Sequence, residues 1–357
     1  MKDFINLPFR LYKNDANWVP PLRSEVRRTL DAKSNPYFRS RRLWLLICYK
    51  NKMAVSRIAL IIKAPADNSS VDKCAQFGFF ESINDVEAVH QLMIKVESIC
   101  KEFDTGLIEG PFSPNHYSEL GMQTSRFGTT QSFFQTYNPE YYNELLKSNG
   151  FAVSGFLHTR NNNLIKDFIK KNYNGNTKKI NQPGYSIRQF NLKKLKRDLE
   201  FLREIYNDAF ASNRYFSAVS REEYLFTAKY LKWIAEPELI RFVEYEGKPV
   251  GVVQCIRDIN PLIKKLNGRM NLFKFLGFIK DRKNLNSLII YAVGIKKSFQ
   301  HSDVFNMLFN EMISIAKNFD VLETTWMYKE NLLAVRAAER LGLTPDKEFV
   351  IYEKRLK

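Results

Sequence analysis

The strongest structural signal in the chain lies at residues 331–343, which read NLLAVRAAERLGL. Asn331 is well suited to the N-cap of a helix, because its side chain can accept a hydrogen bond from the first turn. Ala334 leaves room for close helix packing, and Gly342 can end the helix in a left-handed conformation. The segment therefore predicts a short helix with defined ends, placed between two strands.

The elements before this helix repeat an order found in the first half of the chain. The second half is expected to contain helices at 192–211 and 221–234, strands at 239–246, 249–257 and 288–295, a helix over 305–316, a strand at 321–327, the helix at 331–341 and a strand at 349–354. The first half has strands at 43–49, 54–62 and 75–82, a helix at 84–103, a strand at 105–109, a helix at 139–149 and a strand at 151–158. Both halves run β-β-β-α-β-α-β, which predicts two copies of one α/β domain.

A basic stretch separates the two copies. Residues 161–184 are rich in Asn, Lys and Gly, and residues 161–200 carry a local charge of +7. We therefore expect an N-terminal domain at 1–160, a linker at 161–184 and a C-terminal domain at 185–357 with a lid-like insertion at 258–286. The linker is either a solvated, partly flexible connector or a basic surface that rests on acidic lipid headgroups.

The composition narrows the choice of partners. The chain has 357 residues, and 55 Lys and Arg against 38 Asp and Glu give a charge of +17, which favours an anionic partner. Nucleic acid is an unlikely one, because no recognised binding module is present. No apolar run approaches the ~20 residues of a membrane span, and residues 1–10 lack the apolar core of a signal peptide. We expect a cytoplasmic protein, peripheral to the inner membrane, with free cysteines and no metal site.

Residues 331–343 resemble the segment N-x-x-A-x-x-L-Y-E-K-x-G-F of the Gcn5-related N-acyltransferases (GNATs). The resemblance implies two tandem GNAT-like domains, each a mixed twisted sheet flanked by helices. It also implies an acyl thioester whose pantetheine arm pairs with the strand at 288–295, while the pyrophosphate lies at the next helix N-terminus. The expected thioester-binding residues are Val293, Gly294, Ile295, Lys296, Lys297, Gln300, His301, Ser302 and Asn331.

The phosphate-binding loop departs from the GNAT pattern Q/R-x-x-G-x-G/A. Gln300 matches its first position, but Asp303 and Phe305 replace the two glycines. One interpretation is that Asp303 caps the following helix and the pyrophosphate site is lost or displaced. The other is that Lys296, Lys297 and His301 hold a donor differently, such as an acyl carrier protein whose phosphopantetheine lacks the nucleotide.

The family's thiolate-protonating Tyr is also replaced, by Ala338. The general acid would then be another tyrosine, with Tyr291, Tyr328 and Tyr352 as candidates by strand position. A tyrosine in such a position is more often a core residue with its hydroxyl at the rim.

A narrower resemblance covers nearly the whole chain. It rests on the segments 9–22 (FRLYKNDANWVPPL), 35–38 (NPYF), 78–81 (GFFE), 110–111 (GP), 137–142 (YNPEYY), 267–269 (NGR), Trp326, 330–331 (EN) and 352–354 (YEK). This set is similar to the bacterial ceramide synthase-like group of tandem GNAT proteins. The resemblance implies that a fatty acyl group moves from a CoA or acyl carrier protein thioester to the amine of a long-chain amino lipid such as a sphingoid base.

Amide formation needs a neutral amine, and a lysine-like pKa near ~10.4 makes deprotonation at pH 7 cost about 4–5 kcal/mol. Glu330, beside the expected helix start, is the candidate base, although an exposed acid near a helix N-terminus has a purely structural explanation. A main-chain N–H of residues 293–295 would meet the oxyanion, and Gly294 is expected at a bulge or a close approach.

Five further residues are expected to bind substrate. They are Asn260 and Arg269 in the insertion, Trp326 after a strand, and His116 and Glu119 in a loop of the first half. The insertion mixes apolar and basic residues, so it is either a helical hairpin over the core or an amphipathic lid that enters the headgroup region.

Three functions fit the sequence. The leading one is direct attack of the amine on the thioester, since no Ser or Cys lies in a nucleophile motif. The second is a catalytically degenerate GNAT-fold module that binds lipid, an acyl carrier or a protein. The third is amino-acid transfer to a cell-wall precursor, as in the tandem Fem-type transferases.

Overall fold

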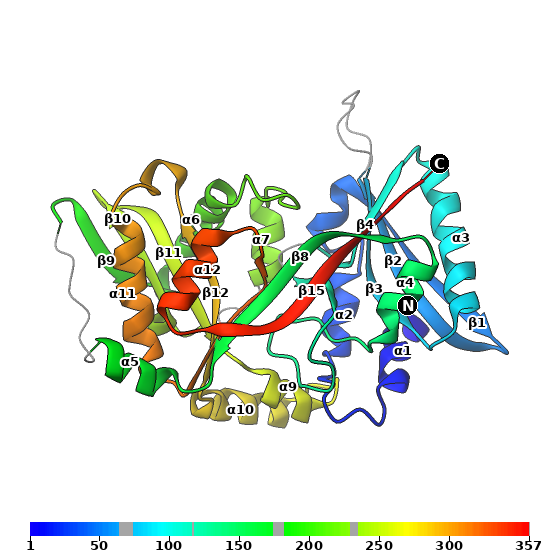
Figure 1. The fold of residues 1–357 in the computed structure, drawn as a ribbon, viewed down its shortest axis with the longest axis horizontal. Coiled ribbons are helices and arrows are strands. Elements are labelled where there is room, and N and C mark those ends of the chain that lie inside the picture. Colours follow the sequence, from blue (N-terminus) through cyan, green and yellow to red (C-terminus); the bar gives the residue numbers. More distant parts are fainter. Residues whose placement is uncertain (64–73, 116–117, 174–181, 229–234, 357) are drawn as a thin grey trace. The chain divides into compact units, whose positions relative to one another are not determined.

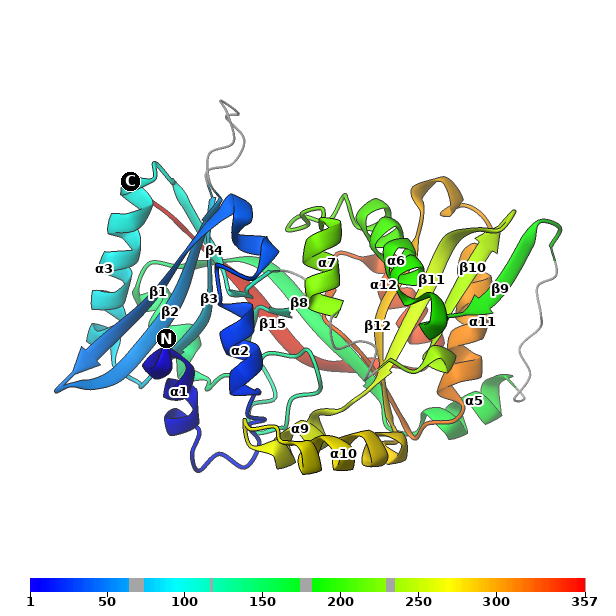
Figure 2. The same ribbon diagram turned by 180° about the vertical axis from the view of Figure 1, so that it is seen from behind.

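The computed structural model describes residues 1–63, 74–115, 118–173, 182–228 and 235–356. The chain forms two compact units. The first unit comprises Met1–His158, Asn260–Lys274 and Lys347–Lys357, and the second unit comprises Thr159–Ile259 and Phe275–Asp346. Figures 1 and 2 show the helices and strands of both from opposite sides.

The first unit is a mixed sheet with helix α3 packed on one face. Its strands follow the order β1-β2-β3-β4-β15-β8, in which β3 and β4 are parallel, β4 and β15 antiparallel. Helix α3 begins where the Asp85 carboxylate accepts the Ala88 N–H, and its apolar stripe, which includes Val89 and Val96, enters the core. The bounds are α1 Lys2–Leu11, α2 Arg23–Thr29, β1 Arg41–Lys50, β2 Met53–Lys63, β3 Cys74–Ser82, α3 Val86–Glu102, β4 Leu107–Gly110, α4 Tyr141–Ser148, β8 Ala152–Asn162 and β15 Thr344–Arg355.

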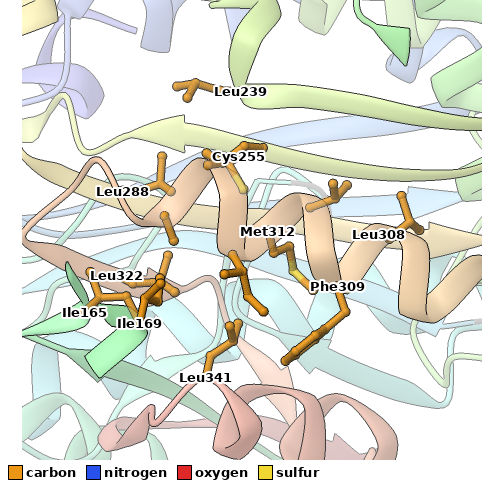
Figure 3. Packing of buried hydrophobic residues seen from close by; sticks show 14 of the residues in the cluster. Ile165, Ile169, Leu239, Cys255, Leu288, Leu308, Phe309, Met312, Leu322 and Leu341 are labelled. Carbon is orange, nitrogen blue, oxygen red and sulfur yellow. The ribbon is translucent and has the colours of Figure 1, made fainter. Parts of the chain in front are cut away.

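The second unit has helices on both faces of its sheet, whose order is β8-β13-β12-β11-β10-β9. Alternate residues of β10 face opposite ways: Val243 enters the core with α11, and Phe242 enters the core with α6. Figure 3 shows Leu308 and Met312 of α11 in the first of these cores. The bounds are α5 Ile165–Tyr173, β9 Tyr185–Gln189, α6 Leu195–Ala209, α7 Arg221–Thr227, β10 Ile240–Tyr245, β11 Lys248–Arg257, β12 Ser287–Ile295, α11 Val304–Ala316, β13 Val321–Thr324, β14 Met327–Tyr328 and α12 Leu332–Arg340.

The last strand of each repeat runs from one unit into the other. β15, the final strand of the chain, pairs with β4 of the first unit, where Tyr352 lies opposite Gly110. β8, the last strand of the first repeat, ends beside β13 of the second unit, where Asn162 lies opposite Leu322. The compact units therefore differ from the predicted domains at 1–160 and 185–357, because strand pairing joins segments that are far apart in sequence.

The predicted basic linker is structured in its described part. β8 extends to Asn162, and α5 follows with Ile165 and Ile169 buried in the core of the second unit. Residues 161–173 of the predicted linker therefore belong to the end of β8, to α5 and to the short connection between them, and residues 174–181 lie outside the described part of the chain. The sequence pattern also missed α1, α2 and β9.

The insertion is helical, as expected. It contains α9 Asn260–Leu266, α10 Leu272–Asp281 and the short 3-10 turn Arg282–Asn284. Among the described residues, no helix is both long enough and apolar enough to cross a membrane.

Candidate active site at the edge of strand β12

Strands β12 and β13 part halfway along β12. They are parallel neighbours only from Ser287 to Ile290, opposite Val321 to Thr324. β12 continues to Ile295 beside β11, whereas the chain after Thr324 turns away to β14, which pairs with β8. In the described structure, residues 291–295 of β12 thus have a neighbouring strand on one side only. The other edge can take a ligand that pairs with the main chain.

The parting point carries a β-bulge at Tyr291. Cys255 of β11 lies opposite Ile290 and Gln254 lies opposite Ala292, so Tyr291 has no residue across from it. Thr325 fixes this point, because its N–H donates to the Ile290 carbonyl at 3.2 Å and its hydroxyl to the Tyr291 carbonyl at 3.0 Å. A bulge re-aims the strand beyond it, which here is the open segment 291–295.

Gly294 marks a close approach, one of its two predicted roles, and not the bulge. A Cβ atom added to Gly294 would lie 2.9 Å from Ile205 Cγ2 and 3.3 Å from Tyr206 Cδ1, both on α6. The missing side chain therefore lets α6 pack against the main chain of β12.

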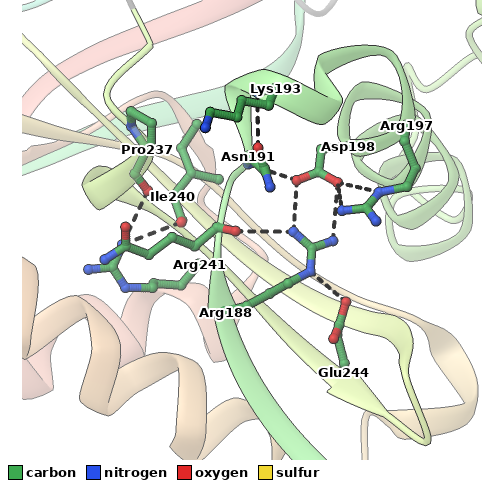
Figure 4. Close-up of polar contacts among 10 residues, drawn as sticks. Arg188, Asn191, Lys193, Arg197, Asp198, Pro237, Ile240, Arg241 and Glu244 are labelled. Carbon is green, nitrogen blue, oxygen red and sulfur yellow. Dashed lines mark hydrogen bonds and ion pairs between the residues drawn. The ribbon is translucent and has the colours of Figure 1, made fainter.

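Helix α6 is itself held by a buried ionic network (Figure 4). The Asp198 carboxylate, fully buried, accepts from Arg188 Nη1 at 2.7 Å, from Arg197 Nη2 at 2.8 Å and from the Asn191 N–H at 2.8 Å. Arg188 also donates to Glu244 at 2.6 Å. The network ties the start of α6 to β9 and β10, and so fixes the helix that packs on β12.

Two carboxylates lie at the loop between β12 and α11, that of Asp208 on α6 and that of Asp303 in the loop itself. The Lys297 N–H donates to Asp208 Oδ2 at 2.5 Å, and the Val304 N–H donates to Ser302 Oγ at 3.3 Å. Asp303 is the N-cap residue of α11, as predicted. Its carboxylate accepts hydrogen bonds from the side-chain amides of Gln182 and Asn306, and none from the N–H groups of the first helical turn. Two main-chain donors are thus already used, and two carboxylates would repel a diphosphate by ~1–4 kcal/mol each at 4 Å.

Phe305 packs beside α12. Its ring centroid lies 5.9 Å from that of Phe309, one turn further along α11, and the Arg340 guanidinium lies 5.9 Å above the Phe305 ring. Arg340 also covers the Phe309 ring at 4.1 Å. Phe305 therefore has packing partners on α11 and α12.

Helix α12 has the predicted ends. The Asn331 side chain accepts the Ala334 N–H at 3.2 Å, and Gly342 has φ +69°. Ala338 is buried in the core, so the position of the family's tyrosine supplies no hydroxyl. Glu330 lies exposed just before the helix, where a carboxylate is free to meet a substrate.

The three candidate tyrosines have different surroundings. Tyr291 is half-buried at the open edge, and burial raises its pKa to about 12, so it stays protonated at neutral pH. Burial also raises the pKa of Tyr328, which stacks on Tyr215 with ring centroids 6.2 Å apart. Tyr352 is 1% exposed in the core of the first unit and donates to Asn143 at 3.0 Å. This burial speaks against Tyr352 as the acid.

The predicted substrate residues belong to both units: Asn260, Arg269 and Glu119 to the first, and Trp326 to the second. Asn260 is buried, and its side-chain amide donates to the Gln131 carbonyl at 2.8 Å. Arg269 is exposed in the turn after α9. Trp326 is half-buried, with its ring centroid 5.8 Å from that of Tyr328. His116 lies outside the described residues. Glu119 is solvent-exposed, yet surrounding protein atoms and the nearby Glu81 raise its pKa to about 7, while Arg57 lowers it.

Sequence reasoning missed a buried polar cluster in the first unit. Glu81 Oε2 accepts from the Tyr12 and Tyr142 hydroxyls, both at 2.8 Å, and Glu81 Oε1 pairs with Arg57 at 3.4 Å. Burial raises the pKa of Glu81 and Arg57 lowers it. The sequence did hold a signal for this cluster. Segments 9–22, 78–81 and 137–142, which carry the resemblance to the ceramide synthase-like group, supply Tyr12, Glu81 and Tyr142 respectively.

No family model matches the chain, but two curated proteins match it over its full length. The bacterial ceramide synthase of Caulobacter vibrioides (strain NA1000 / CB15N) is 27% identical, with 95% of that protein covered. Protein YghO of Escherichia coli (strain K12) is 24% identical, with 93% covered.

Solved structures show the same architecture. A tandem GNAT protein from the clavulanic acid biosynthesis pathway superposes with a TM-score of 0.57 at 10% identity, over 99% of this chain and 94% of that one. The chain has the tandem GNAT fold. A GCN5-related N-acetyltransferase from Sphaerobacter thermophilus has a TM-score of 0.50 at 12% identity, over 99% of this chain and 91% of that one.

The tandem GNAT fold and the resemblance to the ceramide synthase-like group are both confirmed, and together they support an N-acyltransferase. The open edge of β12 belongs to the strand at which the GNAT resemblance predicts the acyl donor to bind. Among the described residues, no group of His, Cys, Asp and Glu side chains is placed to hold a metal ion.

Proposed function

We propose that the protein transfers a fatty acyl group from a CoA or acyl carrier protein thioester to the amine of a long-chain amino lipid, such as a sphingoid base. The observation that carries the proposal is the open main-chain edge of β12 at residues 291–295. The full-length likeness to a protein named bacterial ceramide synthase supports the choice of acceptor. The reaction takes place in the cytoplasm, at the surface of the inner membrane.

The residues of the second unit suggest a direct transfer. The pantetheine arm pairs with the free edge of β12, and a main-chain N–H of Val293, Gly294 or Ile295 donates to the oxyanion that forms when the amine attacks the thioester carbonyl. Tyr291, protonated at neutral pH, is the candidate donor of a proton to the leaving thiolate. The acyl–nitrogen bond forms as the acyl–sulfur bond breaks.

Glu330 is the candidate base of this reaction. It belongs to the same unit as β12 and is exposed beside the Asn331 cap of α12. The turnover of Glu330→Gln tests this role.

A carrier-protein thioester fits the loop before α11 better than CoA does. Asp208 and Asp303 lie at the loop where the GNAT resemblance predicts the pyrophosphate, so their charge disfavours CoA there. Lys297, Gln300 and His301 are exposed on the same loop and present polar and basic groups to an incoming acidic protein.

The second candidate is a binding module without catalysis. Asp303 and Phe305 in place of the loop glycines, and Ala338 in place of the tyrosine, are the observations that favour it.

The test mixes the protein with a long-chain acyl-CoA or acyl carrier protein and a sphingoid base, and measures thiol release and amide product. Acceptor-dependent release supports the proposal, and donor binding without amide formation for any long-chain amine favours the binding module. Glu330→Gln should reduce turnover at least about tenfold at unchanged thermal stability. Glu102→Gln, an exposed acid at the end of α3, is the matched control.

A further inference from the structure

Helix α10 exposes large apolar side chains. The exposed fraction is 68% for Leu272, 84% for Phe273 and 57% for Leu276, and Met270 just before the helix is also exposed. Burying each such side chain would contribute about 1.5–3 kcal/mol of favourable free energy. A run of them on one short helix therefore indicates a surface that is covered when the protein functions.

These side chains share one face of α10. At 100° per residue, Leu272, Leu276, Lys280 and Phe273 fall at 0°, about 40°, about 80° and about 100°, whereas Phe278 falls at about 240°. The structure agrees, because the first four are exposed and Phe278 is buried. The helix therefore has an inner side that packs on the protein and an outer side that is apolar with a basic border.

The insertion that contains α10 carries a strong positive charge. Residues 260–286 contain seven Lys and Arg against the single acid Asp281. Arg269, Lys280 and Lys283 are exposed, and none of them pairs with a carboxylate among the described residues. Unpaired cations around an apolar face match the phosphates and acyl chains at the surface of an anionic bilayer.

The start of α10 is held in place. The Asn271 side chain accepts the Lys274 N–H at 2.9 Å, and Lys274 Nζ donates to the Leu266 carbonyl at 2.9 Å. The preceding turn is anchored as well, since the Arg23 N–H donates to the Gly268 carbonyl at 3.1 Å. The helix presents its outer side without having to fold on contact.

We propose that the outer side of α10, formed by Leu272, Phe273 and Leu276 with Arg269, Lys280 and Lys283, is the membrane-docking surface of this protein and binds anionic bilayers. The apolar side chains enter the acyl-chain boundary, and the cations contact headgroup phosphates. This surface deepens the proposed function, because it specifies how the enzyme reaches an acceptor that is itself a membrane lipid.

The test is flotation of the full-length protein with vesicles of phosphatidylcholine, with and without phosphatidylglycerol. The protein should float with the anionic vesicles and be released by salt. Phe273→Gln with Leu276→Gln should lower the bound fraction at least about tenfold. The control pair Met53→Gln with Leu164→Gln, similarly exposed elsewhere, should float like the wild type.

The charge is tested separately. Lys280→Gln with Lys283→Gln should weaken binding to anionic vesicles and reduce its salt dependence, whereas Lys95→Gln with Lys196→Gln, also exposed, should not. The proposal is overturned if the wild type does not float at low salt, or if both α10 variants float unchanged. It is also overturned if sedimentation shows that the α10 variants abolish self-association instead, because the surface would then join two copies of the chain.

Acyl transfer in detergent micelles separates this proposal from the proposed function. Phe273→Gln with Leu276→Gln should keep wild-type turnover there, since the acceptor no longer has to be reached at a bilayer. Flotation without turnover in any condition would leave the docking surface standing and refute the proposed reaction.

Discussion

Gly294 offers a direct test of the packing that leaves the β12 edge open. A Cβ atom at this position would approach Ile205 Cγ2 to 2.9 Å. Ile205 is fully buried and β-branched, so its side chain cannot rotate away without displacing its neighbours. We therefore expect Gly294→Ala to push α6 and β12 apart.

The expected magnitude follows from two opposing terms. Overpacking costs about 1–3 kcal/mol, and replacing a glycine in a strand returns about 0.5–1 kcal/mol of backbone entropy. Gly294→Ala should therefore lower the free energy of unfolding by about 1–2 kcal/mol, and Gly294→Val by more. Because Gly294 belongs to the open edge, the KM for the thioester donor should rise as well.

Urea unfolding and donor-dependence of thiol release measure the two effects. Gly277→Ala is the matched control, because a Cβ at Gly277 meets no atom within 4 Å. That substitution should stabilise α10 by up to about 1 kcal/mol and leave the donor KM unchanged. If Gly294→Ala keeps wild-type stability within about 0.5 kcal/mol and a wild-type donor KM, α6 does not approach β12 as described.

Two further variants test separate parts of the account. Asp198→Ala leaves Arg188 without its buried partner and should cost about 3–5 kcal/mol in urea unfolding, and a loss below about 1 kcal/mol would show that the network does not hold α6. Asp208→Asn with Asp303→Asn should lower the KM for acyl-CoA about tenfold more than that for an acyl carrier protein, whereas equal responses would contradict the assignment of this loop.

Local signals in the sequence predicted most elements correctly. Helix α12 has its Asn331 cap and its left-handed Gly342, because both features depend only on a few neighbouring residues. The strands and helices of the two repeats followed from hydrophobic periodicity in the same way. The pairing of a donor with the strand at 288–295 was predicted only through the GNAT resemblance.

Non-local pairing set the limit of prediction. The alternation of residues 349–354 indicates a strand but not its partner, and β15 pairs with β4 of the first unit. Tyr352, a candidate acid by its strand position alone, therefore lies in the core of the first unit. The cluster of Glu81, Arg57 and Tyr142 was missed for the same reason, since its members come from different elements and become neighbours only in the fold.

The most direct test of the central claim is a crystal structure with a nonhydrolysable long-chain acyl-pantetheine analogue. The account predicts that the pantetheine arm lies along residues 291–295 of β12, with its amides paired to the main chain and the acyl carbonyl position within hydrogen-bond distance of a main-chain N–H of residues 293–295. An analogue bound with β12 still uncovered, or a β12 edge filled by the protein's own side chains in the complex, would contradict it.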